Sequence, residues 1–173
     1  MVGVDEKAQW LIQRAEIIVE KAQEKLRNRS RERELRRDIE REYKLMMRGN
    51  NMHTGLIKFI EENQLEDLNL EFFIKPGGIC EAIAASITFK PTQLRKLFHE
   101  LRRLQHEEFS KIRLLKLVPF IAYAKGRDLI DEDFYSFVKT FIQKIEDRQA
   151  FKIFIDIFEA IVAYHRYYNP KES

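Results

Sequence analysis

The sequence predicts an all-α fold, and three observations support it. Apolar residues recur every three or four positions along most of the chain, which is the period of an amphipathic helix. The chain has only four Pro and six Gly in 173 residues, and most of them fall between the periodic segments. No Asn-Gly or Asp-Gly pair separates two alternating apolar runs, so no β-hairpin is indicated. We expect one domain, with a long charged N-terminal helix over residues 1–50 and a compact bundle of about five or six helices over residues 51–173.

The N-terminal segment, residues 4–48, has the helical period and contains no Pro or Gly. Between Arg27 and Arg41, however, only two apolar side chains are placed to face a core. Such a segment projects into solvent, packs on another chain, or breaks near residues 28–30. We expect a single long helix that forms an arm.

Six further helices are predicted, separated by Pro, Gly and polar turns, over about residues 54–64, 79–87, 91–106, 109–125, 131–146 and 148–168. Thr54 and Asp131 are the expected N-caps, and Pro91 opens its helix at the first position, where a missing N–H costs nothing. Residues 65–75 are ambiguous, because their weak alternation is also compatible with an extended segment.

Positive charge is unevenly distributed along the chain. The net charge is only +3, although charged residues make up 34% of the sequence. Residues 21–50 hold eleven Lys and Arg against six Asp and Glu, a local excess of +5. This excess favours an anionic partner bound at a defined surface, although the same charges also form ion pairs along a helix.

The predicted helix over residues 91–106 divides into two faces. Its apolar face consists of Leu94, Leu97, Phe98, Leu101 and Leu104. Its opposite face holds only basic or potentially basic residues, namely Arg95, Lys96, His99, Arg102, Arg103 and His106. A face of one sign favours anion binding, because like charges four residues apart repel one another. The alternative is a solvated face whose partner acids lie on neighbouring helices, and the pattern leaves both open.

The next predicted helix, over residues 109–125, has a stripe of basic and aromatic residues: Arg113, Lys116, Phe120, Tyr123 and Arg127. Such interleaving suits single-stranded nucleic acid, whose bases stack on rings and whose phosphates bind cations. The favoured interpretation of Phe120 and Tyr123 is nevertheless structural, as a wider core face. Pro119 is expected to kink this helix or to mark its real start.

The C-terminal helix is apolar around more than half of its circumference. A helix of this kind lies at the centre of a core or is shared with another chain, so self-association is expected. His165 lies on the apolar face and is expected to be a core or interface residue.

No pattern of residues indicates catalysis. The four His do not form an HExxH motif, no phosphate-binding glycine loop is present, and no metal site or cofactor is predicted. The single cysteine, Cys80, excludes an internal disulfide and suggests the cytoplasm. No apolar run approaches the roughly 20 residues of a membrane helix, so no membrane is expected.

Three segments in order resemble a known family: TQLRK at residues 92–96, LVPFIAYAKGR at residues 117–127 and FEAIVAYH at residues 158–165. Together they are similar to the small subunit, Csm-two, of type III-A CRISPR effector complexes. The resemblance implies a helical protein without catalytic activity, several copies of which stack beside the backbone subunits. It implies that a basic surface lines the groove where CRISPR RNA pairs with target RNA, while cleavage belongs to the backbone and large subunits.

The resemblance places matching basic positions at Arg95, Lys96, Lys125 and Arg127, with Tyr123 and Tyr164 as structural residues. The predicted RNA-binding residues, including those from the two helical faces, are Arg95, Lys96, Arg102, Arg103, Arg113, Lys116, Lys125 and Arg127. Two alternatives stay open: a helical protein-interaction scaffold without nucleic-acid contact, and a DNA-binding regulator that uses residues 95–103 as a recognition helix.

Overall fold

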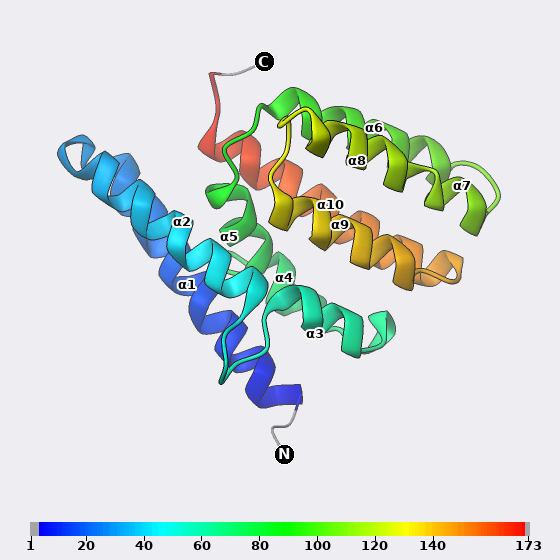
Figure 1. Ribbon diagram of the computed structural model, residues 1–173, viewed down its shortest axis with the longest axis horizontal. Coiled ribbons are helices and arrows are strands. Elements are labelled where there is room, and N and C mark those ends of the chain that lie inside the picture. The colour runs from blue at the N-terminus through cyan, green and yellow to red at the C-terminus, as the bar shows by residue number, and fades with distance from the viewer. Residues whose placement is uncertain (1–3, 172–173) are drawn as a thin grey trace.

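The computed structural model describes residues 4–171, and these form packed helices without a β-strand (Figure 1). The all-α prediction is confirmed. The expected number of helices was slightly low, because eight α-helices in the described residues have seven or more residues and two more have five. The additional helices arise where two predicted segments break and where the ambiguous residues 65–75 become helical.

The expected single N-terminal helix is wrong. Helix α1 (Val4–Arg27) ends at Asn28, whose backbone leaves the helical region (φ −129°, ψ 89°). A single 3-10 turn, η1 (Arg29–Arg31), then reverses the chain into α2 (Glu32–Arg48). The two helices pack as an antiparallel hairpin (Figure 1). Because the chain turns back near residues 28–30, α2 packs on α1 and its few apolar side chains are buried. A projecting helix would leave them in water.

The segment after the hairpin turns tightly before it becomes helical again. Gly49 has φ +75°, and a Cβ atom there would lie 2.4 Å from the backbone nitrogen of Gly55. Gly55, rather than the predicted Thr54, is the N-cap of α3 (Leu56–Glu62). The ambiguous residues that follow are not a strand: they form a 3-10 turn, η2 (Leu65–Asp67), and a short helix, α4 (Leu70–Ile74).

The centre of the core is formed by α5 (Ile79–Ser86) and α10 (Arg148–Tyr168). Helix α5 packs against both α1 and α10, and α10 also packs against α4 and α6. Five phenylalanine rings pack in succession through the core, namely Phe137, Phe141, Phe154, Phe158 and Phe134. The apolar character of α10 is therefore satisfied within one chain, and His165 is buried in the core at 2% exposure.

The remaining helices are α6 (Pro91–Gln105), α7 (Lys111–Leu115), α8 (Leu117–Gly126) and α9 (Glu132–Lys144). Helices α6 to α8 form a layer outside α9 and α10, which we call the α6–α8 layer (Figure 1). As predicted, Pro91 is the first residue of α6 and Asp131 caps α9, accepting a 2.7 Å hydrogen bond from the Phe134 backbone nitrogen. The single helix expected over residues 109–125 is instead α7 and α8, separated at Lys116.

Candidate nucleic-acid interface

The orientation of α6 is set by its apolar face. Leu94, Leu97, Leu101 and Leu104 are buried, and the ring of Phe98 stacks on Phe158 of α10 with a centroid separation of 6.2 Å. This packing turns the opposite face to solvent, where Arg95, Lys96, Arg102 and Arg103 are exposed. The charged face predicted from the sequence is thus on the outside of the α6–α8 layer.

That face is not of one sign, because neighbouring acids neutralise part of it. Arg103 donates to Glu100 at 2.8 Å and to Glu107 at 3.1 Å, and the hydrogen bond to Glu100 is the main cause that raises the pKa of Arg103. Arg102 lies over the Phe98 ring and 3.9 Å from Glu159 of α10. By contrast, Arg95 and Lys96 make no side-chain hydrogen bond or ion pair with residues 4–171.

A groove of about 620 Å³ lies between α6, α7 and α8. It brings together three of the predicted residues, Arg103, Arg113 and Lys116, with the ring of Phe120 on its wall. Glu107 is the shared acid of the groove, since it also accepts from Arg113 at 2.7 Å. Lys116 has no ion pair within the described part of the chain, so it is the unneutralised cation of this groove.

Helix α8 begins two residues before Pro119 and buries only one narrow face, which leaves its aromatic residues exposed. Pro119 is the third residue of α8, where a backbone N–H would have no partner within the helix, so proline costs no hydrogen bond. The core face of α8 is narrow, with only Leu117, Ile121 and Ala124 buried. Phe120 and Tyr123 are 44% and 66% exposed, so the expectation that they widen the core face is wrong.

The C-terminal end of α8 holds the last two predicted residues. Arg127 lies over the Tyr123 ring, with its guanidinium carbon 5.7 Å from the ring centroid. Lys125 lies 3.5 Å from Glu132 of α9 and is partly neutralised. Helices α6 and α8 run side by side (Figure 1), and residues from the beginning of α6 and the end of α8 line one narrow hollow. The pairs Arg95–Lys96 and Lys125–Arg127 therefore lie at the same end of the layer, away from the groove.

Sequence reasoning missed one residue of this surface, Glu107. Glu107 lies beyond the end of α6, and its four-residue spacing from Arg103 was the signal that could have revealed it. Tyr164 is structural as expected, since its hydroxyl donates to the Ile74 carbonyl at 2.8 Å.

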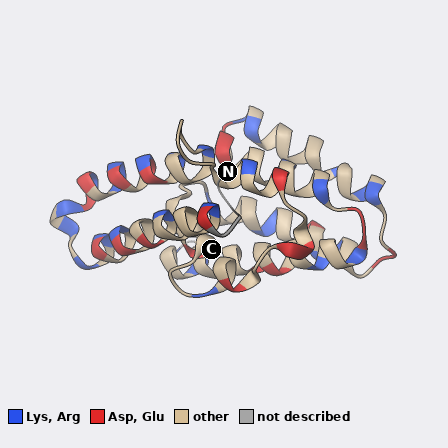
Figure 2. Ribbon diagram, turned by 90° about the horizontal axis from the view of Figure 1, so that it is seen from below, with Lys and Arg blue, Asp and Glu red and all other residues tan. Residues whose placement is uncertain are grey.

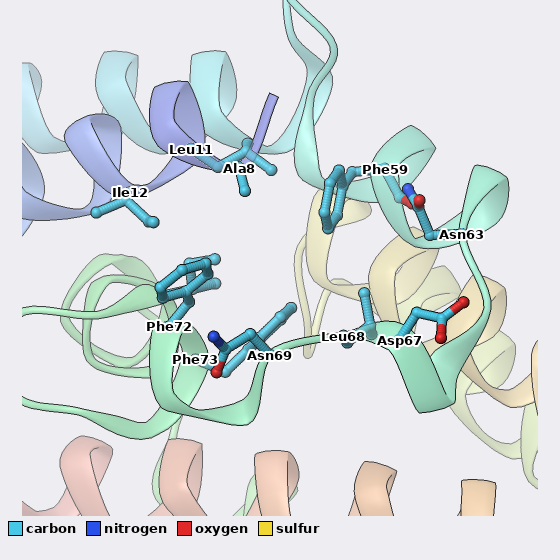
Figure 3. Close-up of a pocket in the computed structure, with 11 residues that line it drawn as sticks. Ala8, Leu11, Ile12, Phe59, Asn63, Asp67, Leu68, Asn69, Phe72 and Phe73 are labelled. Atoms are coloured by element: carbon cyan, nitrogen blue, oxygen red, sulfur yellow. The ribbon is translucent and has the colours of Figure 1, made fainter. Parts of the chain in front are cut away.

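The described residues offer no metal site or reactive thiol. Among residues 4–171 no group of three or more His, Cys, Asp or Glu is placed to hold a metal ion. Cys80 is fully buried, and burial raises the pKa of its thiol. A pocket of about 260 Å³ between α1, α3 and α4 is lined mainly by apolar side chains (Figure 3), and the amide of Asn63 on its rim already donates to the Phe59 carbonyl.

The fold and its surface define a small all-α protein with a partly neutralised cationic layer of three helices. Residues 77–171, slightly more than half of the chain, match the model of the family described as Csm2 Type III-A, and the chain belongs to this family. It is therefore a subunit of a type III-A CRISPR complex and associates with other subunits of that complex. Comparison with curated proteins and with solved structures finds no match. No single helix in residues 4–171 is long and apolar enough to cross a membrane.

Proposed function

We propose that this chain is a non-catalytic, RNA-binding structural subunit whose α6–α8 layer lines the groove between guide RNA and target RNA in cytoplasmic antiviral defence. The observation that carries the proposal is the exposure of unpaired cations and aromatic rings on one layer. Arg95, Lys96 and Lys116 lack acidic partners in the described residues, and Phe120 and Tyr123 are exposed in the same layer. The layer lies entirely within the family-matched residues 77–171.

In this proposal the cations bind phosphates and the rings bind unpaired bases. Arginine and lysine side chains that contact the phosphate backbone position a protein without reading sequence, which suits a complex whose guide supplies the specificity. An exposed ring can stack on any base, because every base has a π-face. The partners are CRISPR RNA, target RNA, the backbone and large subunits, and further copies of this chain stacked along the RNA.

The test is a variant that removes four cations without an acidic partner: Arg95→Gln, Lys96→Gln, Lys116→Gln and Arg127→Gln. Its matched control removes four cations that pair with acids elsewhere on the surface: Lys7→Gln, Lys44→Gln, Lys58→Gln and Lys152→Gln. Both variants change the net charge by −4, so a loss due only to net charge appears in both. Binding of a fluorescent 40-nucleotide uridine RNA is measured by anisotropy, and helicity by circular dichroism.

We expect the α6–α8 variant to bind at least tenfold more weakly than the control variant, with unchanged helicity. The slope of log K against log salt concentration is expected to fall by up to about 3, at about 0.7 for each lost contact to a single strand. Equal affinity of the two variants would contradict the assigned surface. Co-purification with the complex that survives nuclease treatment, combined with no RNA binding, would favour the protein-interaction scaffold.

A further inference from the structure

The outer end of the α1–α2 hairpin is a second cationic surface. We define the hairpin tip as residues 25–37, which span the last turn of α1, η1 and the first turn and a half of α2. It holds seven Lys and Arg against two Asp and Glu, a net charge of +5 in thirteen residues. The tip lies outside the family-matched residues 77–171 and at the opposite side of the molecule from α7 (Figures 1 and 2).

Both acids of the tip accept hydrogen bonds from arginines, and four other arginines are left unpaired. Arg31 donates to both Glu24 and Glu34, which holds η1 against the two helices. Arg36 donates to Glu32 at 3.0 Å. The arginines that remain exposed, with no side-chain hydrogen bond or ion pair within residues 4–171, are Arg27, Arg29, Arg33 and Arg37.

Folding of the hairpin also brings like charges together at the base of the tip. The Asn28 turn places the end of α1 beside α2, and Lys25 is half-buried there. Burial lowers the pKa of Lys25, and the charge of Arg36 lowers it further, against a smaller opposing effect of Glu32. A bound polyanion would relieve this repulsion, because it adds negative charge where the fold supplies too little.

We propose that the hairpin tip is a second RNA-binding surface, separate from the α6–α8 layer, and that it binds backbone phosphates. Guanidinium groups suit this role, since their planar fork donates two parallel hydrogen bonds to one phosphate. The tip contains no aromatic residue, so it contacts phosphates rather than stacked bases. The choice of RNA among polyanions rests on the proposed function, whereas the site itself rests on the unpaired arginines.

Two other anionic partners fit the tip less well. A membrane surface is bound by a helix with a broad apolar face, and Leu26, 48% exposed, is the one large exposed apolar side chain in the described tip. An acidic protein segment would be held best in a groove, and the groove of about 420 Å³ at the base of the tip is lined by Lys25, Leu26 and Arg36 but by none of the four unpaired arginines. The experiment below includes both as competing outcomes.

The experiment uses the full chain with Arg29→Gln, Arg33→Gln and Arg37→Gln. The control carries Lys44→Gln, Lys58→Gln and Lys152→Gln, which remove the same charge from cations that pair with acids four residues away along their helices. Four proteins are titrated against a fluorescent 40-nucleotide uridine RNA at several salt concentrations: the tip variant, its control, the wild type and the α6–α8 variant. Anionic phosphatidylserine vesicles and polyglutamate are the parallel probes.

We expect the tip variant to bind RNA at least tenfold more weakly than its control, with a salt slope smaller by about 2. Equal RNA affinity and slope of these two proteins would overturn the proposal. So would a loss confined to the vesicles or to polyglutamate, or an absence of RNA binding by the wild type. The two surfaces are distinguishable: if only the tip variant loses affinity, the tip stands and the assignment to the α6–α8 layer fails.

Discussion

The guanidinium of Arg127 lies over the exposed ring of Tyr123, and one of its nitrogens also donates to the Tyr123 hydroxyl at 3.5 Å. This contact holds a cation beside an aromatic face at the end of α8. A phosphate and an adjacent base of a single strand could be bound by these two groups together.

Replacement of the ring tests this arrangement. Tyr123→Ala is expected to weaken RNA binding by roughly tenfold, because stacking of one base on an aromatic ring contributes about 1–3 kcal/mol. The control is Tyr135→Ala on α9, where Lys139 lies over the ring at a similar 5.5 Å but outside the α6–α8 layer. If the two variants lose the same affinity in an anisotropy titration, Tyr123 does not contact RNA.

Removal of the shared acid of the groove is expected to strengthen RNA binding. Glu107→Gln frees Arg113 and removes one of the two acids paired with Arg103, whose pair with Glu100 remains. We expect an affinity gain of several-fold at low salt, which decreases as salt screens the charges. Glu62→Gln is the control, because Glu62 also forms ion pairs with two cations, Lys7 and Lys58, on a different surface. A gain of equal size in both variants would show a general charge effect.

The hairpin is joined to the bundle by a buried acid. Arg48 of α2 donates to Asp133 of α9 at 2.7 Å, and the Asp133 side chain is only 7% exposed. Arg48→Ala is expected to lower the free energy of unfolding by about 1–3 kcal/mol, because it leaves a buried carboxylate without its charged partner. Denaturant unfolding measures this cost. Arg41→Ala, which breaks the surface pair with Asp38, is expected to cost less than about 1 kcal/mol.

Tyr43, which is buried near this contact, leads us to expect a loss of stability at high pH. Burial, followed by the nearby charge of Asp131, raises the pKa of Tyr43 well above its usual value. Above about pH 10 the unfolded phenol ionises while the folded one stays protonated. The folded state then binds more protons, so stability falls with rising pH by up to about 1.4 kcal/mol per pH unit.

Tyr43→Phe should remove this contribution and flatten the dependence of unfolding free energy on pH above about pH 10. The comparison is one of slopes, since the variant also loses the 3.1 Å hydrogen bond from Tyr43 to Asp131. Tyr167→Phe changes an exposed phenol and serves as the control. An equally flattened slope in that control would rule out burial as the cause.

The parts of the fold that the sequence predicted well have strong local signals. Helix α6 begins at Pro91 and α9 follows its Asp131 cap, and α10 has the predicted bounds, Arg148–Tyr168. A break between α1 and α2 was one of three possibilities, but a single helix was expected, because Arg and Glu around Asn28 are good helix formers. The turn is favoured instead by the packing of α2 on α1. Tertiary contacts, which a single sequence does not show, decided between the three possibilities.

The candidate site was predictable only in part, for the same reason. The helical period placed Arg95 and Lys96 on the outside of α6, where they are found. It could not show that Glu159 of α10 would approach Arg102, since these residues are far apart in the chain. Nor could it orient α8, whose residues are apolar on most sides, so the exposure of Phe120 depends on which side its neighbours cover.

The most direct test of the central claim is a map of RNA contacts in the assembled type III-A complex. Guide and target RNAs that contain 4-thiouridine are crosslinked by light, and the crosslinked peptides of this subunit are identified by mass spectrometry. We expect crosslinks within residues 91–127, with Phe120 and Tyr123 among the modified positions. Crosslinks to this subunit that fall entirely outside residues 91–127 would contradict the assignment of RNA binding to the α6–α8 layer.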